Sequence, residues 1–503
     1  MLSCSSKSTG PCWQALARSE SGIMSLKKKT VRNLQFVGAA QLLNLCLVQV
    51  GYLILAKILT PDDFGIYAAV LVVFNLCVTI SMVGLDQAAI QSKDESEELL
   101  RTAATFRMTM AIIAIVVVFI LAPVIASFFG RTEMTAPLRV MTAALLISSA
   151  GFVSTVRLAK ALRFRELSIS KTGNAITWIA MALTGGVIGL TYWSMILATL
   201  FASAAALVIL WAYAPWKVSY HIDKVILTRL LHFGKFPAAT SIIVLLVFNL
   251  DKVVVGRWLG PELLGAYFLA FTWGTIVPNI FTNIVNTVMF PTYTHIVHDD
   301  SLLSHAYRHT LTYLGYVSLP ISVGLASISS VFVMGVLGPQ WHNATLPLAI
   351  FSFVGLCGSL TSPAGNVFLA KGRPDRMWLL TWVGFVPFAV LLVPAVVYGG
   401  LGGVSLLMLA IDAFMLIWVW FVASSLASTS FGDIARSLWV PTLCASVMGL
   451  VVYLVSTALT ATIINLVALI ALGVLIYVGL VLILADSDTK KEMLNLATLA
   501  IKR

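Results

Sequence analysis

Long apolar runs recur from residue 34 to residue 485, and they constrain the fold of this chain more than any other feature. A helix needs about 20 apolar residues, at 1.5 Å per residue, to cross the ~30 Å hydrocarbon core of a bilayer. By this criterion the sequence predicts about 14 transmembrane helices and an all-α polytopic membrane protein. The shortest predicted turns between spans lie at residues 189–192 and 398–403, where glycine is frequent.

The composition and the placement of charge agree with this prediction. Hydrophobic residues make up 59% of the chain and charged residues only 11%, whereas soluble domains are about one quarter charged. The net charge of +11 could suggest a nucleic-acid partner, but its distribution argues against one. With both termini inside, all but five of the 32 lysines and arginines fall in inner loops and ends. This asymmetry predicts a multi-pass bacterial inner-membrane protein with both termini in the cytoplasm and no nucleic-acid partner.

A short segment occurs twice. Lys57 to Tyr67 returns as Arg257 to Tyr267 without a gap, 200 residues later (257 − 57), and both copies keep Leu, Pro, Gly and Tyr at matching positions. Each copy ends one apolar run and begins the next, so each reads as a turn between two membrane helices. Paired repeats are the sequence trace of a two-lobed transporter. We expect the two turns to mark equivalent outer corners of two lobes.

The repeat divides the chain into two six-helix lobes with additions. The expected order is a disordered lead at 1–33, an N-lobe at 34–214 (helices 1–6), an amphipathic cytoplasmic linker at 215–235, a C-lobe at 236–426 (helices 7–12), and helices 13 and 14 with a cytoplasmic tail at 427–503. The lead is Ser-rich and lacks the apolar core of a signal peptide. Because Met24 precedes Ser-Leu-Lys-Lys-Lys, translation could begin at Met24 or at Met1.

Charged residues inside apolar spans are candidate functional groups, because each costs a few kcal/mol at mid-membrane and therefore usually faces a partner or a water-filled cavity. Asp86, the adjacent pair Asp251 and Lys252, and Asp412 have this property. Asp251 and Lys252 could equally compensate each other's charge. Asp412 has no basic neighbour in sequence, and we predict it, with Asp86, as an ion-coupling site for a proton or sodium gradient.

Basic residues gather at two inner loops in corresponding places. Arg157, Lys160, Arg163 and Arg165 begin where the fourth span reaches the inner face, and Lys371, Arg373 and Arg376 occupy the comparable loop of the second half. One interpretation is ordinary retention of positive charge inside. The other is an electropositive entrance for a phosphate-bearing head group, since arginine binds phosphate bidentately.

The sequence carries no pattern of an enzyme, a metal site or a resident cofactor. None of the seven histidines has HExxH spacing, and the group around His295 and His298 lies in a polar inner loop. The Gly-rich stretch at residues 398–403 lacks the Lys-Ser/Thr ending of a phosphate-binding loop. We therefore expect a non-enzymatic protein without a metal or other cofactor.

Several motifs resemble the Wzx-type polysaccharide-synthesis flippases of the multidrug, oligosaccharidyl-lipid and polysaccharide exporter (MOP) superfamily. The resemblance covers about residues 30–430. The motifs are LTPDDFGIYA (59–68), GLDQAAIQ (84–91), the basic 163–165 loop, FG (233–234), NLDK (249–252), GRWLGP (256–261), FP (290–291), LGPQW (337–341) and AKGR (370–373).

The resemblance implies a MATE-like fold, with two pseudo-symmetric six-helix lobes plus two C-terminal helices, and it also implies a substrate and a mechanism. Such proteins move an undecaprenyl-pyrophosphate-linked oligosaccharide, a repeat unit of polysaccharide, lipopolysaccharide or exopolysaccharide, from the inner to the outer leaflet by alternating access between two lobes. Asp251 and Lys252 match a recurring acidic-basic pair, and the inner basic residues would meet the pyrophosphate. Expected partners are the lipid-linked oligosaccharide, membrane lipids, a polysaccharide polymerase and glycosyltransferases. A lipid II flippase and a multidrug or small-solute antiporter of the same superfamily remain alternatives.

Overall fold

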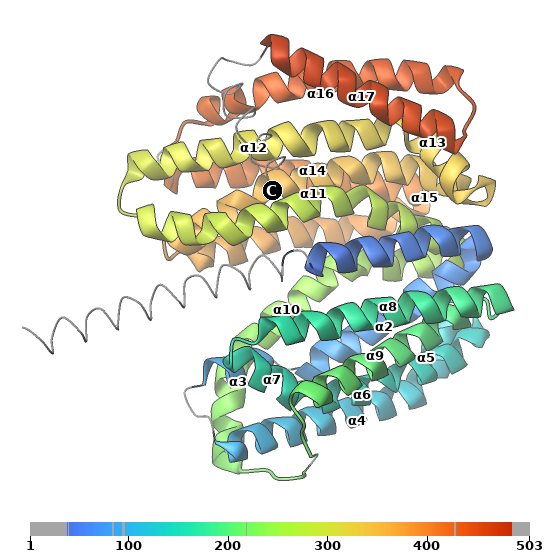
Figure 1. Ribbon diagram of the computed structural model, residues 1–503, viewed down its shortest axis with the longest axis vertical. Coiled ribbons are helices and arrows are strands. Elements are labelled where there is room, and N and C mark those ends of the chain that lie inside the picture. The colour runs from blue at the N-terminus through green and yellow to red at the C-terminus, as the bar shows by residue number, and fades with distance from the viewer. Residues whose placement is uncertain are drawn as a thin grey trace, which may run out of the picture.

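The computed structural model describes Gly38 and residues 40–82, 85–92, 96–217, 219–426 and 429–484. Helices dominate these residues, and no β-strand occurs among them. Figure 1 shows the helices lying roughly parallel, with the first half of the chain (blue to green) on one side and the second half (yellow to red) on the other. The expected lead, the alternative start Met24 and the tail after residue 484 lie outside the described residues.

The helices of the first half follow the predicted spans closely. The fourth predicted span is divided into three short helices, α5 to α7. The bounds are Ala40–Ile58, α2 Pro61–Met82, α3 Leu85–Gln91, α4 Glu97–Phe128, α5 Thr135–Thr142, α6 Ala144–Ala150, α7 Phe152–Lys160, α8 Phe164–Ile188 and α9 Trp193–Tyr213.

The helices of the second half are longer. Their bounds are α10 Lys224–Leu259, α11 Pro261–Ile296, α12 Asp300–Ser327, α13 Ser329–Phe332, α14 Thr345–Ala370, α15 Pro374–Leu426, α16 Phe431–Ala458 and α17 Ile463–Leu484, with irregular turns at Val333–Leu337 and Pro339–Ala344 between α13 and α14.

Ten helices of the described residues are long and apolar enough to cross a membrane, or eleven if the bent pair Asp300–Ser327 and Ser329–Leu337 counts as one more. The count is below 14 partly because α15 joins two helices across a kink, and its 53 residues, enough for two crossings of about 20 residues each, are counted once. Its backbone leaves the helical conformation at Gly400 (φ 55°), inside the predicted turn at 398–403. Polar residues such as Lys171 and Asn174 lower the hydropathy of α8. The number 14 and the lobe layout remain predictions.

The apolar core is divided unequally between the two halves. One cluster joins both halves and is centred on α2 and α11, where Phe64, Tyr267 and Trp341 are fully buried. A second cluster fills the space between α12, α14, α15, α16 and α17. Many apolar side chains of α17, among them Ile464 and Leu475, are exposed, as expected for a lipid-facing helix.

The internal repeat reappears in the backbone at the ends of α7 and α14. Leu162 and Gly372 both adopt positive φ, at 53° and 68°, two residues before the next helix begins. The N–H of Arg163 donates to the Leu158 carbonyl, and the N–H of Arg373 donates to the Phe368 carbonyl. This is the six-to-one hydrogen bond of a helix-ending left-handed turn. The two turns are related by an offset of 210 residues (373 − 163).

The two copies of the sequence repeat meet each other. Gly65 of α2 packs on the carbonyl oxygen of Pro261, and Gly265 of α11 packs on the carbonyl oxygen of Pro61, so that a Cβ at either glycine would overlap with backbone. The two turns thus touch each other where the two halves of the chain meet, at one end of the bundle; that this end is the outer one remains a prediction. We call this contact the glycine crossing, its end of the bundle the turn end, and the end that carries Arg163 and Arg373 the basic end.

The connector differs from the expected separate helix. Residues 215–217 and 219–223 are irregular, and α10 then runs without a break from Lys224 into the predicted seventh span. Asp223 caps this helix by accepting hydrogen bonds from the N–H groups of Ile226 and Val225, which hold the pKa of its carboxyl group below the usual value. Ile226 and Leu230 pack on the first half, so the start of α10 ties the two halves together at the basic end.

Candidate functional site

The adjacent Asp251 and Lys252 lie buried on α10, about two helical turns before this helix ends at Leu259. Asp251 is fully buried and Lys252 is 7% exposed. The hydroxyl of Tyr267 on α11 donates a hydrogen bond of 2.8 Å to Oδ2 of Asp251. The ammonium of Lys252 lies 3.4 Å from both carboxylate oxygens and donates at 2.6 Å to the Phe248 carbonyl. The pair is therefore charge-compensated in this conformation, as one of the two sequence interpretations expects.

Tyr267 was not identified as a site residue from the sequence, although it is one of the matched positions of the repeat. The signal was its place 16 residues after Asp251, just after the turn that reverses the chain. Phe271, one helical turn further, places its ring 4.4 Å from the Lys252 ammonium, a cation–π contact. Two residues of α11 thus contact the pair, Tyr267 at Asp251 and Phe271 at Lys252.

The buried pair breaks the internal symmetry of the chain. At the offset of 200 residues, Asp251 and Lys252 correspond to Gly51 and Tyr52 in the first half. Side chains of Trp178 and Ile179 occupy the space at Gly51, where a Cβ would come within 3.1–3.2 Å of them. The equivalent place in the first half is thus filled by apolar packing, so the charge pair is a property of the second half alone.

Asp412 lies on α15, one helical turn beyond Met408, whose sulfur is 4.0 Å from the Tyr267 hydroxyl. Its side chain is partly buried. The carboxyl group interacts electrostatically with the thiol of Cys357 on α14. Within the described residues no hydrogen bond or ion pair of Asp412 occurs. Met408 and Tyr267 thus connect Asp412 to the Asp251 and Lys252 pair, and both candidate sites lie in the second half of the chain.

Asp86 pairs with a residue of the next helix. Arg107 of α4 donates a short hydrogen bond to the Asp86 carboxylate. The guanidinium is 5% exposed and lies over the ring of Phe152, and its Nε has no hydrogen-bond partner among the described residues. A carboxylate held by a buried arginine is not free to bind a coupling ion in this conformation, so Asp86 would need to leave Arg107 first.

The basic residues of the first half are engaged with neighbours. Arg157 pairs with Glu97 at 3.0 Å and lies over the Trp216 ring. Lys160 donates to the Ser92 carbonyl, and Arg163 pairs with Glu166 at 3.0 Å. Arg157 and Lys160 line a cavity of about 270 Å³ together with Glu97. Arg165 follows at the start of α8 and also has a partner.

The second half repeats this arrangement. Arg373 pairs with Asp375 at 3.0 Å, and Lys371 pairs with Asp300 at 2.7 Å. Arg373 and Asp375 are about half exposed, so the pair is weak and can be exchanged for a stronger anion. The structure therefore places basic residues in corresponding loops of both halves, as expected, and adds an acidic partner beside most of them.

A polar cluster inside the second half was not identified from the sequence. Asn286 of α11 donates to the hydroxyl of Ser362 at 2.6 Å and accepts a hydrogen bond of 2.8 Å from Asn366 of α14. All three are partly buried. Their sequence signal was the presence of amide side chains within two predicted apolar spans.

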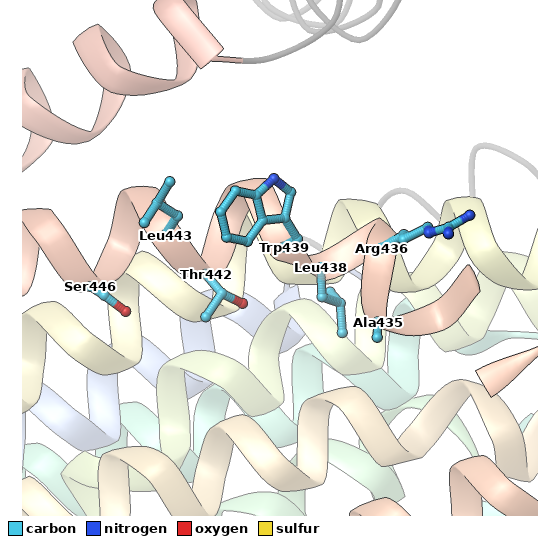
Figure 2. A pocket seen from close by; sticks show the side chains of 7 residues that line it. All are labelled: Ala435, Arg436, Leu438, Trp439, Thr442, Leu443 and Ser446. Carbon is cyan, nitrogen blue, oxygen red and sulfur yellow. The ribbon is translucent and has the colours of Figure 1, made fainter. Parts of the chain in front are cut away.

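Two cavities border the last helices. An apolar cavity of about 480 Å³ lies between α12, α16 and α17 and reaches Pro320, Gly473 and Tyr477. A second cavity of about 580 Å³ runs along α16, and Figure 2 shows Trp439 and Arg436 on the same side of the helix. An arginine next to a tryptophan is typical of a membrane interface. No group of three or more potential metal ligands occurs in the described part of the chain.

Comparisons with known proteins agree on one class. The family described as "Polysaccharide biosynthesis protein" matches residues 54–346. The chain is 27% identical over 430 residues to the lipopolysaccharide biosynthesis protein WzxC of Escherichia coli (strain K12), covering 83% of this chain and 86% of WzxC. It is 26% identical over 463 residues to the succinoglycan biosynthesis transport protein ExoT of Rhizobium meliloti (strain 1021), covering 88% and 90%.

Among solved structures, the lipid II flippase MurJ in an inward closed conformation has a TM-score of 0.75 to this chain. The match covers 88% of this chain and 97% of MurJ at 15% sequence identity. At this identity the likeness concerns the fold alone.

Proposed function

Because the chain belongs to the polysaccharide biosynthesis protein family, we propose that it carries a lipid-linked oligosaccharide from the inner to the outer leaflet of the bacterial inner membrane. The observation that carries this proposal is the similarity to WzxC and ExoT over more than four fifths of the chain and of each relative. The protein is a membrane transporter and not an enzyme. The undecaprenyl-pyrophosphate carrier, alternating access and cytoplasmic termini are parts of the proposal.

The basic end would receive the pyrophosphate. Arg157, Lys160, Arg163, Arg165 and Arg373 supply positive charge there, and the half-exposed Arg373 and Asp375 pair is weak enough to open for a phosphate. Arginine forms two parallel hydrogen bonds to phosphate oxygens, which fixes the head group more firmly than one ammonium does.

The membrane-embedded part would accept the lipid chain and the coupling ion. The apolar cavity between α12, α16 and α17 has the chemistry to hold a hydrocarbon chain. Asp251 with Lys252, which are buried, and the partly buried Asp412, one turn from Met408, are ionisable groups within the membrane of the kind that mark ion pathways. We assign Asp412 to proton or sodium coupling, since it has no ion-pair partner among the described residues.

Deletion of the gene in its host tests the proposed function. We expect lipid-linked repeat units to accumulate on the inner leaflet, and surface polysaccharide to disappear. Both should be restored by the wild-type chain. Accumulation of complete lipid II with normal surface polysaccharide would instead support the lipid II alternative. Unchanged surface polysaccharide and no accumulated lipid-linked sugar would refute the proposal.

A further inference from the structure

The glycine crossing joins two pieces of backbone that the sequence repeat made equivalent. The α2 and α11 helices each begin with proline, and the glycine four residues later receives the proline carbonyl of the other helix. Only a hydrogen atom fits at Gly65 and at Gly265. Such close backbone approach is typical of helix pairs in membranes, where small residues allow packing without an apolar driving force.

Further contacts between the two halves lie around this crossing, at the end of the bundle opposite to the start of α10, where Ile226 and Leu230 pack on the first half. Trp341, from the turn before α14, is fully buried and donates at 2.9 Å to the Ala56 carbonyl, and its ring lies 5.1 Å from that of Phe64. Lys57 donates to the Gly335 carbonyl at 3.4 Å. Further hydrogen bonds and ring contacts between residues 40–213 and residues 236–484 lie toward the turn end as well.

We propose that the glycine crossing is the gate that closes the outer side of the transport pathway, and that Gly65 and Gly265 determine how stable the closed state is. Its reciprocal geometry lets one rotation of the two halves break both contacts together. Separation of the two halves breaks no hydrogen bond within either helix. Each contact is a packing contact between the glycine of one helix and the proline carbonyl oxygen of the other. This inference rests on the proposed function, since a carrier that exposes its site alternately must close one side at a time.

Alanine at either glycine tests the gate. The added methyl group overlaps with a backbone carbonyl in the closed state only, so Gly65→Ala and Gly265→Ala should shift the population toward a state with α2 and α11 apart. The reporter is Ala69→Cys in a chain without other cysteines. Ala69 is 1% exposed and lies one turn from Gly65 on the same face of α2. A membrane-impermeant maleimide added to intact spheroplasts should label it about tenfold faster or more in both alanine variants than in the parent.

Matched controls separate opening from damage. At Gly358 a Cβ meets nothing within 4 Å, so Gly358→Ala should leave the labelling of the reporter unchanged. At Gly274 a Cβ would meet Phe351 at 2.6 Å within the second half, so Gly274→Ala should weaken packing without exposing the reporter. Thr132→Cys, which is exposed in the short helix after α4 at the turn end, should be labelled from outside in every variant. Folded alanine variants whose reporter stays as protected as in the parent would overturn the proposal.

A second measurement covers the case in which an alanine variant does not fold. Asp62 and Glu262 are equivalent positions of the repeat, and each directly follows the proline whose carbonyl group forms the crossing, so the two positions lie on its two sides. A short, reducible cross-linker between Asp62→Cys and Glu262→Cys should hold the gate closed, stop export of lipid-linked sugar, and release it on reduction. Continued export with the link intact would refute the gate. Neither labelling nor cross-linking needs the glycan, so a protein that gates normally but carries another cargo would contradict only the proposed function.

Discussion

At the scale of single residues, the second half carries a buried charge pair that has no counterpart at the equivalent positions of the first half, Gly51 and Tyr52. Lys252 pairs with the Asp251 carboxylate, and the Tyr267 hydroxyl donates a hydrogen bond to Oδ2 of the same carboxylate. The equivalent Gly51 leaves room for Trp178 instead. Burying two charges costs desolvation free energy, so we interpret the pair as functional. Since the equivalent positions of the first half lack it, we expect the second half alone to carry out that function.

Replacing one member of the pair should destabilise the protein strongly. Lys252→Met leaves an uncompensated carboxylate in the core, and we expect a loss of about 3–5 kcal/mol. Asp251→Asn combined with Lys252→Met should recover much of this loss while transport stays impaired. Thermal unfolding of the purified protein in detergent measures the first effect, and export of lipid-linked sugar measures the second.

Tyr267→Phe, which removes one hydrogen bond to a charged group, should lower the stability by about 1.5–3 kcal/mol, measured by the same thermal unfolding. If all three variants are as stable as the parent, neither the ion pair nor the Tyr267 hydrogen bond is formed.

Asp412 should act differently from this pair. Since no ion pair holds it among the described residues, Asp412→Asn should change the stability by less than about 1 kcal/mol while export loses its dependence on the ion gradient. Export is measured in vesicles with an imposed proton or sodium gradient. Normal export with unchanged gradient dependence would remove Asp412 from the mechanism.

At the scale of elements, the two helix ends at the basic end use the same turn with different residues. Leu162 adopts the left-handed conformation that Gly372 adopts in the second half, and its side chain is 56% exposed. A non-glycine residue in this region is strained by roughly 1–2 kcal/mol. The first half therefore tolerates a cost that the second half avoids.

Reciprocal substitutions should reveal this cost. Leu162→Gly should stabilise the protein by about 1 kcal/mol, because it removes the strain and loses little packing, and Gly372→Ala should destabilise it by a similar amount. Chemical or thermal unfolding in detergent compares the two with the parent. Gly399→Ala serves as the control, since a Cβ there meets nothing within 4 Å. Destabilisation by Leu162→Gly would show that side-chain packing outweighs backbone strain at this turn.

At the scale of the whole molecule, the sequence predicted the class, the membrane location and the family well, and the comparisons confirm the Wzx-type resemblance. Long apolar runs and charge placement carry the class and the membrane location, and the resemblance of the short motifs carries the family. The repeat at Pro61 and Pro261 was visible, but the direct contact of Gly65 with Pro261 was not, because a pattern along the chain does not show which of its copies touch. The same holds for Arg107 beside Asp86 and for Asn286 beside Asn366, which are 21 and 80 residues apart in sequence.

The most direct test of the central claim uses the purified protein in liposomes that contain an undecaprenyl-pyrophosphate-linked repeat unit from the host. The measured quantity is the rate at which the sugar becomes accessible to an external glycosidase. We predict that the wild-type chain speeds this rate well above that of protein-free liposomes, that the Asp62→Cys and Glu262→Cys cross-link abolishes the gain, and that reduction restores it. A rate equal to that of protein-free liposomes, with the protein folded and an ion gradient imposed, would contradict the account.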